Sequence, residues 1–391
     1  MPSIAEPRAL TPAASANLDL IRALAAWAVM WGHLRADFFV DYSQLRHDGL
    51  LSSIIYFLTG FGTEAVLVFF VLSGFLISSA IFSRRAAGTW SWRDYAIDRS
   101  SRLYVVLIPG LLFGLLWDTV GSSIFASTGV YSQPLKSFGL FVVQGRLGVG
   151  TFLGNLFFLQ TIVCPTYGSN GPLWSLANEF WYYVLFPVAL AAGLAWKQRS
   201  ARAAIPLTIL AACVAAFVGW TILLGFSIWL SGTILVLAYS KWTISSKGSL
   251  VLYTLASSVV LAVSLVAART GSSAVLGNNL SVGISFSVFL FAVLQMSPGA
   301  VGASYSRIAR TVAGFSYSLY VLHFPLLLFL TAWLVPSQRW QPDSVHLAYG
   351  LAIGVAVLGF AWLASLFTEG KTSVARRWMR SILPRFDSRI G

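Results

Sequence analysis

Residues 17–34 read NLDLIRALAAWAVMWGHL, an apolar run that predicts a membrane-spanning helix, because about 20 mostly apolar residues cross the hydrocarbon core. Arg22 lies near the start of this run and His33 near its end. On a helix the two side chains lie about 20° apart around the axis and about 16 Å apart along it. A charge in such a segment normally faces a partner or a water-filled cavity, so this helix face is predicted to be functional.

The composition of the whole chain fits this first segment. Of its 391 residues, 57% are hydrophobic and 10% are charged, whereas about 25% are charged in soluble domains. We therefore expect an all-α, polytopic integral membrane protein. The net charge of +13 is attributed to basic residues in cytoplasmic loops rather than to nucleic-acid binding. Cys164 and Cys213 have no metal-ligand spacing, so neither a disulfide framework nor a metal site is expected.

The number of spans follows from the lengths of the apolar segments. Ten segments qualify, at roughly 17–36, 54–82, 103–120, 172–195, 203–223, 226–240, 249–268, 280–297, 312–333 and 346–367. The Gly-broken stretch 148–164 is interpreted as re-entrant or interfacial. With an inside N-terminus, 19 of the 26 Lys and Arg residues fall in inner segments and six in outer ones, which predicts two cytoplasmic termini. The expected organisation is a disordered cytoplasmic tail (1–16), a membrane domain (17–369) and a basic cytoplasmic tail (370–391).

A pair of arginines closes the first predicted cytoplasmic loop. Arg99 and Arg102 stand one helical turn apart, where two guanidinium groups can hold a diphosphate. The alternative is ordinary loop charge of the kind that the topology rule expects.

A carboxylate is predicted inside the membrane on the fourth segment, which begins at Gly171-Pro172. Ser175 and Glu179 are four residues apart and share a face, and Glu179 lies about 10 Å into the bilayer. A carboxylate at that depth must face water or a partner. A structural ion pair or hydrogen bond remains the alternative to catalysis.

Two further groups of polar residues qualify as candidates. Ser316, Tyr320 and His323 form one polar stripe on the ninth segment, which is suited either to lining a cavity or to packing. Glu64 is predicted near the outer end of the second segment, where it either orients His33 or is an interfacial carboxylate without a chemical task.

Taken together, five ordered segments resemble the acyltransferase 3 family of bacterial membrane O-acyltransferases. They are LDLIRALAAWAVMWGH, VFFVLSGFLIS, RSSRLYVVLIP, GPLWSLANEFWYYVLFP and GFSYSLYVLHFPL. The resemblance covers nearly the whole chain. It implies about ten spans in the bacterial inner membrane. It also implies transfer of an acyl group, usually acetyl from cytoplasmic acetyl-CoA, to a hydroxyl of an envelope or extracellular glycan or glycolipid.

The resemblance also assigns residues by motif. The family's arginine–histidine motif falls on Arg22 and His33, its arginine pair on Arg99 and Arg102, and its WSLxxE motif on Trp174, Ser175 and Glu179. The second segment departs from the pattern. Many members carry a polar residue close to the FF pair, whereas here Ala65-Val66-Leu67-Val68 leads up to it and the acid stands at Glu64. Glu64 is retained as a substrate-side candidate.

These assignments imply separate roles for donor binding and for catalysis. Arg22, Arg99 and Arg102 would bind the acyl-CoA donor, and no permanently bound cofactor is expected. His33 would be the general base on the acceptor hydroxyl, because an imidazole pKa near 6.5 suits that task.

The remaining assignments concern the acceptor and the oxyanion. Glu179 would orient the histidine or bind sugar hydroxyls, Trp174 would stack on the sugar, and Ser175 would hydrogen-bond it. His323 and Tyr320 are candidates for stabilising the oxyanion. A covalent acyl-enzyme on His33 or Ser175 stays open.

Two alternative functions remain. One is acylation of a lipid or small metabolite, which the family also includes. The other is a transporter or flippase, in which the same polar residues line a path without chemistry. Transporters often contain inverted repeats, and none is visible in this sequence.

Overall fold

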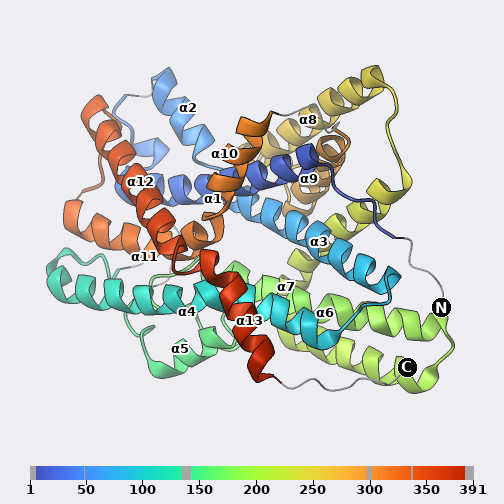
Figure 1. The fold of residues 1–391 in the computed structure, drawn as a ribbon. Helices are drawn as coiled ribbons and strands as arrows, with labels where there is room; N and C mark the ends of the chain where they lie inside the picture. The colour runs from blue at the N-terminus through green and yellow to red at the C-terminus, as the bar shows by residue number, and fades with distance from the viewer. Residues whose placement is uncertain (1–5, 48, 134–141, 297–301, 336–337, 384–391) are drawn as a thin grey trace.

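The computed structural model describes residues 6–47, 49–133, 142–296, 302–335 and 338–383. These residues form helices and connecting turns without a β-strand, which confirms the all-α prediction (Figure 1). The α-helices are α1 Pro12–Phe38, α2 Leu50–Leu58, α3 Gly62–Ala86, α4 Trp92–Ile124, α5 Val149–Leu156, α6 Leu173–Lys197, α7 Ala201–Lys241, α8 Lys247–Thr270, α9 Asn279–Leu294, α10 Ala303–Ala313, α11 Ser316–Leu334, α12 Ser344–Ser365 and α13 Thr372–Ile382.

Several of these helices are suited to a bilayer. Within the described ranges, seven helical stretches are long and apolar enough to cross a membrane, and the apolar α9 is shorter. The protein is therefore a multi-pass membrane protein by length and composition. The count of ten spans and the cytoplasmic location of both termini stay predictions. The stretch 148–164 contains only the eight-residue α5, which is too short to span.

Two helix boundaries differ from the predicted ones. The predicted segments 203–223 and 226–240 merge into α7, which is broken at Gly219 by a non-helical backbone with φ +77°. Glycine adopts that left-handed value without steric cost. The predicted segment 312–333 is divided near Gly314 into α10 and α11, and this break brings the N-terminus of α11 to the interior.

Both predicted tails contain helix. Thr11 caps α1 by accepting a hydrogen bond from Ala14 N at 3.1 Å, and Pro12 occupies the first turn. Because Ala13 and Ala14 are fully buried, the prediction of disorder is wrong from Pro12 onward. The C-terminal tail includes α13. Residues 1–5 and 384–391 of the two tails lie outside the described residues.

Close helix contacts hold the centre of the bundle. α3 packs against α1, α7 and α9, and α4 packs against α11 and α13. A Cβ atom on Gly232 would lie 2.2 Å from Val71 O, and one on Gly74 would lie 1.9 Å from Trp229 O. Only glycine permits this approach of α3 and α7, which is how small residues commonly act between membrane helices. α13 lies across α4 (Figure 1).

Candidate functional site

A cavity of about 220 Å³ lies among α1, α3, α4, α6, α11 and α13. Six of the predicted site residues line it: Arg22, Arg99, Arg102, Ser175, Glu179 and Tyr320. They come from α1, α4, α6 and α11, so helices distant in sequence converge on one space. The cavity has a cationic end and an end that leads to two histidines.

Four arginines line the cavity, and three of them are Arg22, Arg99 and Arg102. Arg22 is paired with Asp19 at 3.1 Å, one turn earlier on α1. Arg102 is partly buried and interacts electrostatically with Glu369 and Glu179. The Nε atoms of Arg22 and Arg99 are buried and have no hydrogen-bond partner among the described residues. Such atoms are strong donors, and a bound anion would satisfy them.

Glu369 contributes a negative charge next to this cationic end. Its carboxylate accepts hydrogen bonds from Tyr317 N at 3.2 Å and Ser318 N at 3.3 Å, at the first turn of α11. It also interacts electrostatically with Arg22 and Arg102. A carboxylate at a helix N-terminus is favoured by the exposed N–H groups there. The Glu369 carboxylate thus fixes the start of α11 and offsets the positive charge of two arginines.

Glu179 is anchored by hydroxyl groups. Its Oε1 atom accepts hydrogen bonds from Tyr183 OH and from Ser73 Oγ, the latter at 3.2 Å. Trp229 Nε1 donates to the same Ser73 oxygen at 3.1 Å. These contacts come from α3, α6 and α7 and keep the carboxylate in the cavity wall beside Arg102. They make Glu179 part of a hydrogen-bonded network within the membrane domain.

At the other end, hydroxyl and imidazole groups meet in pairs. Ser175 Oγ and Tyr320 OH lie 2.6 Å apart, and His33 Nδ1 lies 2.8 Å from His323 Nε2. His323 Nδ1 lies 2.9 Å from Leu319 O. The rings of Tyr320 and His323 are 6.2 Å apart between centroids, so the histidine pair follows directly behind the tyrosine.

Arg22 and His33 were predicted to share one functional face of the first helix, but only Arg22 lines this cavity. His33 and His323 do not belong to the cavity lining. Ser175 and Tyr320 do belong to this lining, and the Tyr320 ring neighbours that of His323.

The contacts of His323 define the tautomers of the histidine pair. A carbonyl oxygen only accepts, so the proton of neutral His323 is on Nδ1, facing Leu319 O. His323 Nε2 then accepts, and His33 donates to it from Nδ1. In neutral His33 this leaves the lone pair on Nε2. His323 thus fixes the ring of His33 in the form that can take up a proton.

The structure separates two further predicted residues from the cavity. Trp174 packs edge-to-face on Phe70, with centroids 6.1 Å apart, and lines a second cavity of about 400 Å³ together with Asn178 and the break at Gly219. Glu64 lies in the first turn of α3 and interacts electrostatically with Arg269 of α8. Its Oε2 atom has no hydrogen-bond partner in the described part of the chain.

Five residues around the cavity lack a recognisable sequence signal. They are Ser73, Tyr183, Tyr317, Glu369 and Arg376. The exception is Tyr183, because its four-residue spacing from Glu179 could have indicated that the two side chains are in contact. In the sequence, Glu369 looks like part of an ordinary helix end and Arg376 like part of a basic tail. No group of three or more potential metal ligands occurs among the residues that the structure describes.

Comparison with known proteins provides the family. A family model described as an acyltransferase domain matches residues 15–366, which is most of the chain. The chain belongs to the acyltransferase 3 family. The stretch that the family model matches contains every residue of the cavity lining except Arg376, which follows it in the chain.

Three curated relatives are similar to parts of this family member. Nodulation protein 10 of Rhizobium leguminosarum bv. viciae is 25% identical over 54% of this chain and 52% of its own length. The putative peptidoglycan O-acetyltransferase YrhL of Bacillus subtilis is 28% identical over 44% of this chain and 26% of its own. Acyltransferase MdmB of Streptomyces mycarofaciens is 29% identical over 44% and 38%. The matched parts thus span about half or less of each relative, and no solved structure matches.

Proposed function

We propose that this family member is a membrane O-acyltransferase that moves an acyl group, most simply acetyl, from acyl-CoA to a hydroxyl of an envelope or extracellular glycan. The observation that carries the proposal is the single cavity with guanidinium groups at one end and the Ser175–Tyr320 pair in front of two histidines at the other. One of the relatives is named a putative peptidoglycan O-acetyltransferase.

The donor binds at the cationic end in this proposal. The phosphate groups of acyl-CoA contact Arg99 and Arg102, whose fork-shaped guanidinium groups suit phosphate oxygens. The thioester arm follows the cavity past Arg22 toward Tyr320. From Arg22 to His33 the continuous helix α1 measures about 16 Å, a length comparable to that of a pantetheine arm.

The chemistry takes place at the histidine end. His33 Nε2 takes the proton of the acceptor hydroxyl while the hydroxyl oxygen attacks the thioester carbonyl carbon. The carbonyl oxygen becomes an oxyanion, and we assign the neighbouring hydroxyl groups of Ser175 and Tyr320 as its hydrogen-bond donors. The C–S bond then breaks, an ester forms, and the proton held by His33 leaves with the CoA thiol.

Glu179 and Trp174 have supporting roles in this scheme. Glu179 interacts with Arg102, and its hydrogen bonds with Ser73 and Tyr183 fix its position. Trp174 stands one residue before Ser175 and faces the second cavity. An aromatic face beside the amide of Asn178 is a suitable surface for a sugar ring, so we assign this second cavity to a part of the glycan acceptor remote from the hydroxyl that reacts at His33.

The test is the O-acetyl content of envelope glycans in a deletion strain complemented with the wild-type gene or with His33→Ala at matched membrane abundance. The expected result is restoration by the wild type alone, together with acetyl-CoA-dependent release of CoA by the purified wild-type protein. Equal restoration by His33→Ala would contradict the proposed role of the histidine. Transport of a substrate without any release of CoA would favour the transporter.

A further inference from the structure

The C-terminal helix α13 lies against the mouth of the cavity. One of its residues, Arg376, belongs to the cavity lining together with Arg99 of α4. The helix begins directly after the turn Glu369–Lys371, and Glu369 interacts with Arg22 and Arg102. α13 is therefore connected to the cationic end both through the chain and through space.

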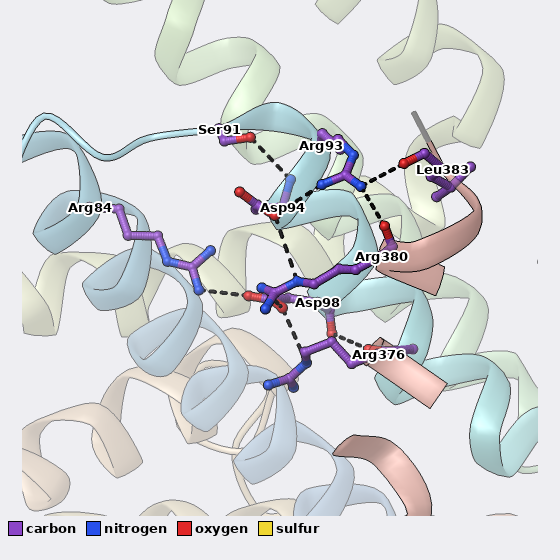
Figure 2. A network of polar contacts seen from close by, with 9 residues as sticks. Arg84, Ser91, Arg93, Asp94, Asp98, Arg376, Arg380 and Leu383 are labelled. Atoms are coloured by element: carbon purple, nitrogen blue, oxygen red, sulfur yellow. Dashed lines mark hydrogen bonds and ion pairs between the residues drawn. The ribbon is translucent and has the colours of Figure 1, made fainter. Parts of the chain in front are cut away.

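A buried carboxylate fastens α13 to α4. Asp98 is only 3% exposed and forms ion pairs with Arg84 of α3 at 2.6 Å, Arg376 at 3.1 Å and Arg380 at 3.3 Å (Figure 2). Asp94 of the same helix pairs with Arg380 at 3.7 Å and with Arg93 at 3.6 Å, so two carboxylates face four guanidinium groups in this cluster. Positive charge is therefore in excess, and Asp98 immediately precedes Arg99 in α4.

The far end of α13 is also held. Arg93 Nη2 donates hydrogen bonds to Arg380 O at 2.9 Å and to Leu383 O at 2.6 Å, as Figure 2 shows. These carbonyl groups are among those that the last turn of a helix leaves without an internal partner, and a cation at that position is favourable. α13 is thus docked at two points on the N-terminal part of α4, and this fixes the position of Arg376.

We propose that α13 forms part of the donor site and that Arg376 binds a phosphate group of the adenosine 3′-phosphate 5′-diphosphate portion of acyl-CoA, with Asp98 as its positioning residue. The proposal rests on the function proposed above. CoA carries phosphate at two separate places, and Arg376 provides a guanidinium on α13 in addition to the Arg99–Arg102 pair on α4. Arg376 is partly exposed, at 37% of its side chain, so a ligand can reach it from the mouth of the cavity.

The test compares Arg376→Ala with Arg377→Ala in the purified full-length protein. Arg377 is the adjacent residue on the same helix, carries the same charge and is exposed. We expect Arg376→Ala to raise KM for acetyl-CoA about tenfold, equivalent to about 1.4 kcal/mol, with kcat within about twofold. Arg377→Ala should leave both constants unchanged, and Arg376→Lys should fall between. An unchanged KM in Arg376→Ala, or equal effects of the two alanine variants, would overturn the proposal.

A binding measurement separates this proposal from the proposed function. Adenosine 3′,5′-bisphosphate is the probe, titrated into wild type, Arg376→Ala and Arg377→Ala without any acceptor. Weaker binding in Arg376→Ala alone supports the phosphate contact. Equal binding in all three overturns the role of Arg376 and leaves the acyltransferase intact. If wild type neither binds the probe nor releases CoA from acetyl-CoA, the proposed function fails as well.

Asp98→Asn tests the positioning role. This change weakens the ion pairs that hold α13, so hydrogen exchange of the α13 amides should speed up and KM for acetyl-CoA should rise. In Arg376→Ala the α13 amides should stay protected, because Arg380 and Arg93 still hold the helix. Faster exchange in Asp98→Asn with an unchanged KM would show that docking of α13 does not serve the donor site.

Discussion

The two ends of the cavity satisfy their polar groups in opposite ways. At the cationic end, Arg22 and Arg99 have buried Nε atoms without hydrogen-bond partners among the described residues, and Glu369 is shared between two arginines. At the histidine end, Ser175 and Tyr320 are hydrogen-bonded to each other, and His33 to His323. The cationic end is suited to an anionic ligand, which would satisfy these donors. The histidine end is already complete within the protein and is suited to moving a proton.

This contrast predicts that substitutions at the two ends have different kinetic effects. Loss of a guanidinium that contacts the donor in both ground and transition states raises KM with little change in kcat. Loss of a group that acts only on the developing charges lowers kcat. Variants at the two ends therefore distinguish binding from chemistry.

The largest effect is expected at His33. His33→Ala removes the only base that the scheme contains, so kcat should fall about 10³-fold, within the range typical of general acid–base catalysis. The measurement is acetyl-CoA-dependent CoA release by purified protein. Binding of adenosine 3′,5′-bisphosphate should be unchanged and is the control for folding. Weakened binding of that probe would mean that the two ends do not act separately.

A smaller loss of kcat is expected at His323, because it acts through His33. His323→Ala removes the acceptor of the His33 Nδ1–H hydrogen bond and should lower kcat about 10²-fold. His323→Gln retains an oxygen that can accept this bond and should recover part of the loss. The pH profile of kcat should move in the alanine variant, since the environment of the base has changed. Equal activities of the two variants would argue against a positioning role.

At the cationic end, Arg99→Ala should raise KM for acetyl-CoA about tenfold, as expected for one charge-assisted hydrogen bond. kcat should change less than about threefold. Because the contact is electrostatic, the increase in KM should become smaller as ionic strength rises. A drop in kcat at unchanged KM would place Arg99 in the chemical step and remove the distinction between the two ends.

The sequence alone predicted much of the fold and part of the contrast between the cationic end and the histidine end of the cavity. The apolar periods placed the helices, and residues on one helix face, such as Ser175 and Glu179, do share the cavity wall. Sequence spacing could not place residues relative to other helices. The pairing of His33 with His323 joins α1 to α11, and nothing within either helix specifies its partner.

The same limit explains the residues at the cationic end. Asp98 and Arg376 are distant in the chain, and their contact depends on how α13 folds back across α4. A basic tail has the same composition whether it is solvated or docked. Gly219 illustrates the limit for helix boundaries, because a glycine inside an apolar run is compatible with both a straight helix and a break.

The smallest effect is expected at Glu64, which the sequence placed near His33. Glu64 interacts with Arg269 and lies away from the cavity. Glu64→Gln preserves the shape of the side chain and removes its charge, so kcat and KM for acetyl-CoA should both stay within about twofold of wild type. A kcat loss comparable to that of His323→Ala would extend the histidine end to the first turn of α3. A carboxylate whose loss lowers kcat without changing KM acts on the catalytic base and not on donor binding. The histidine end would then include Glu64 as well as His33 and His323, and the cationic end would stay as described.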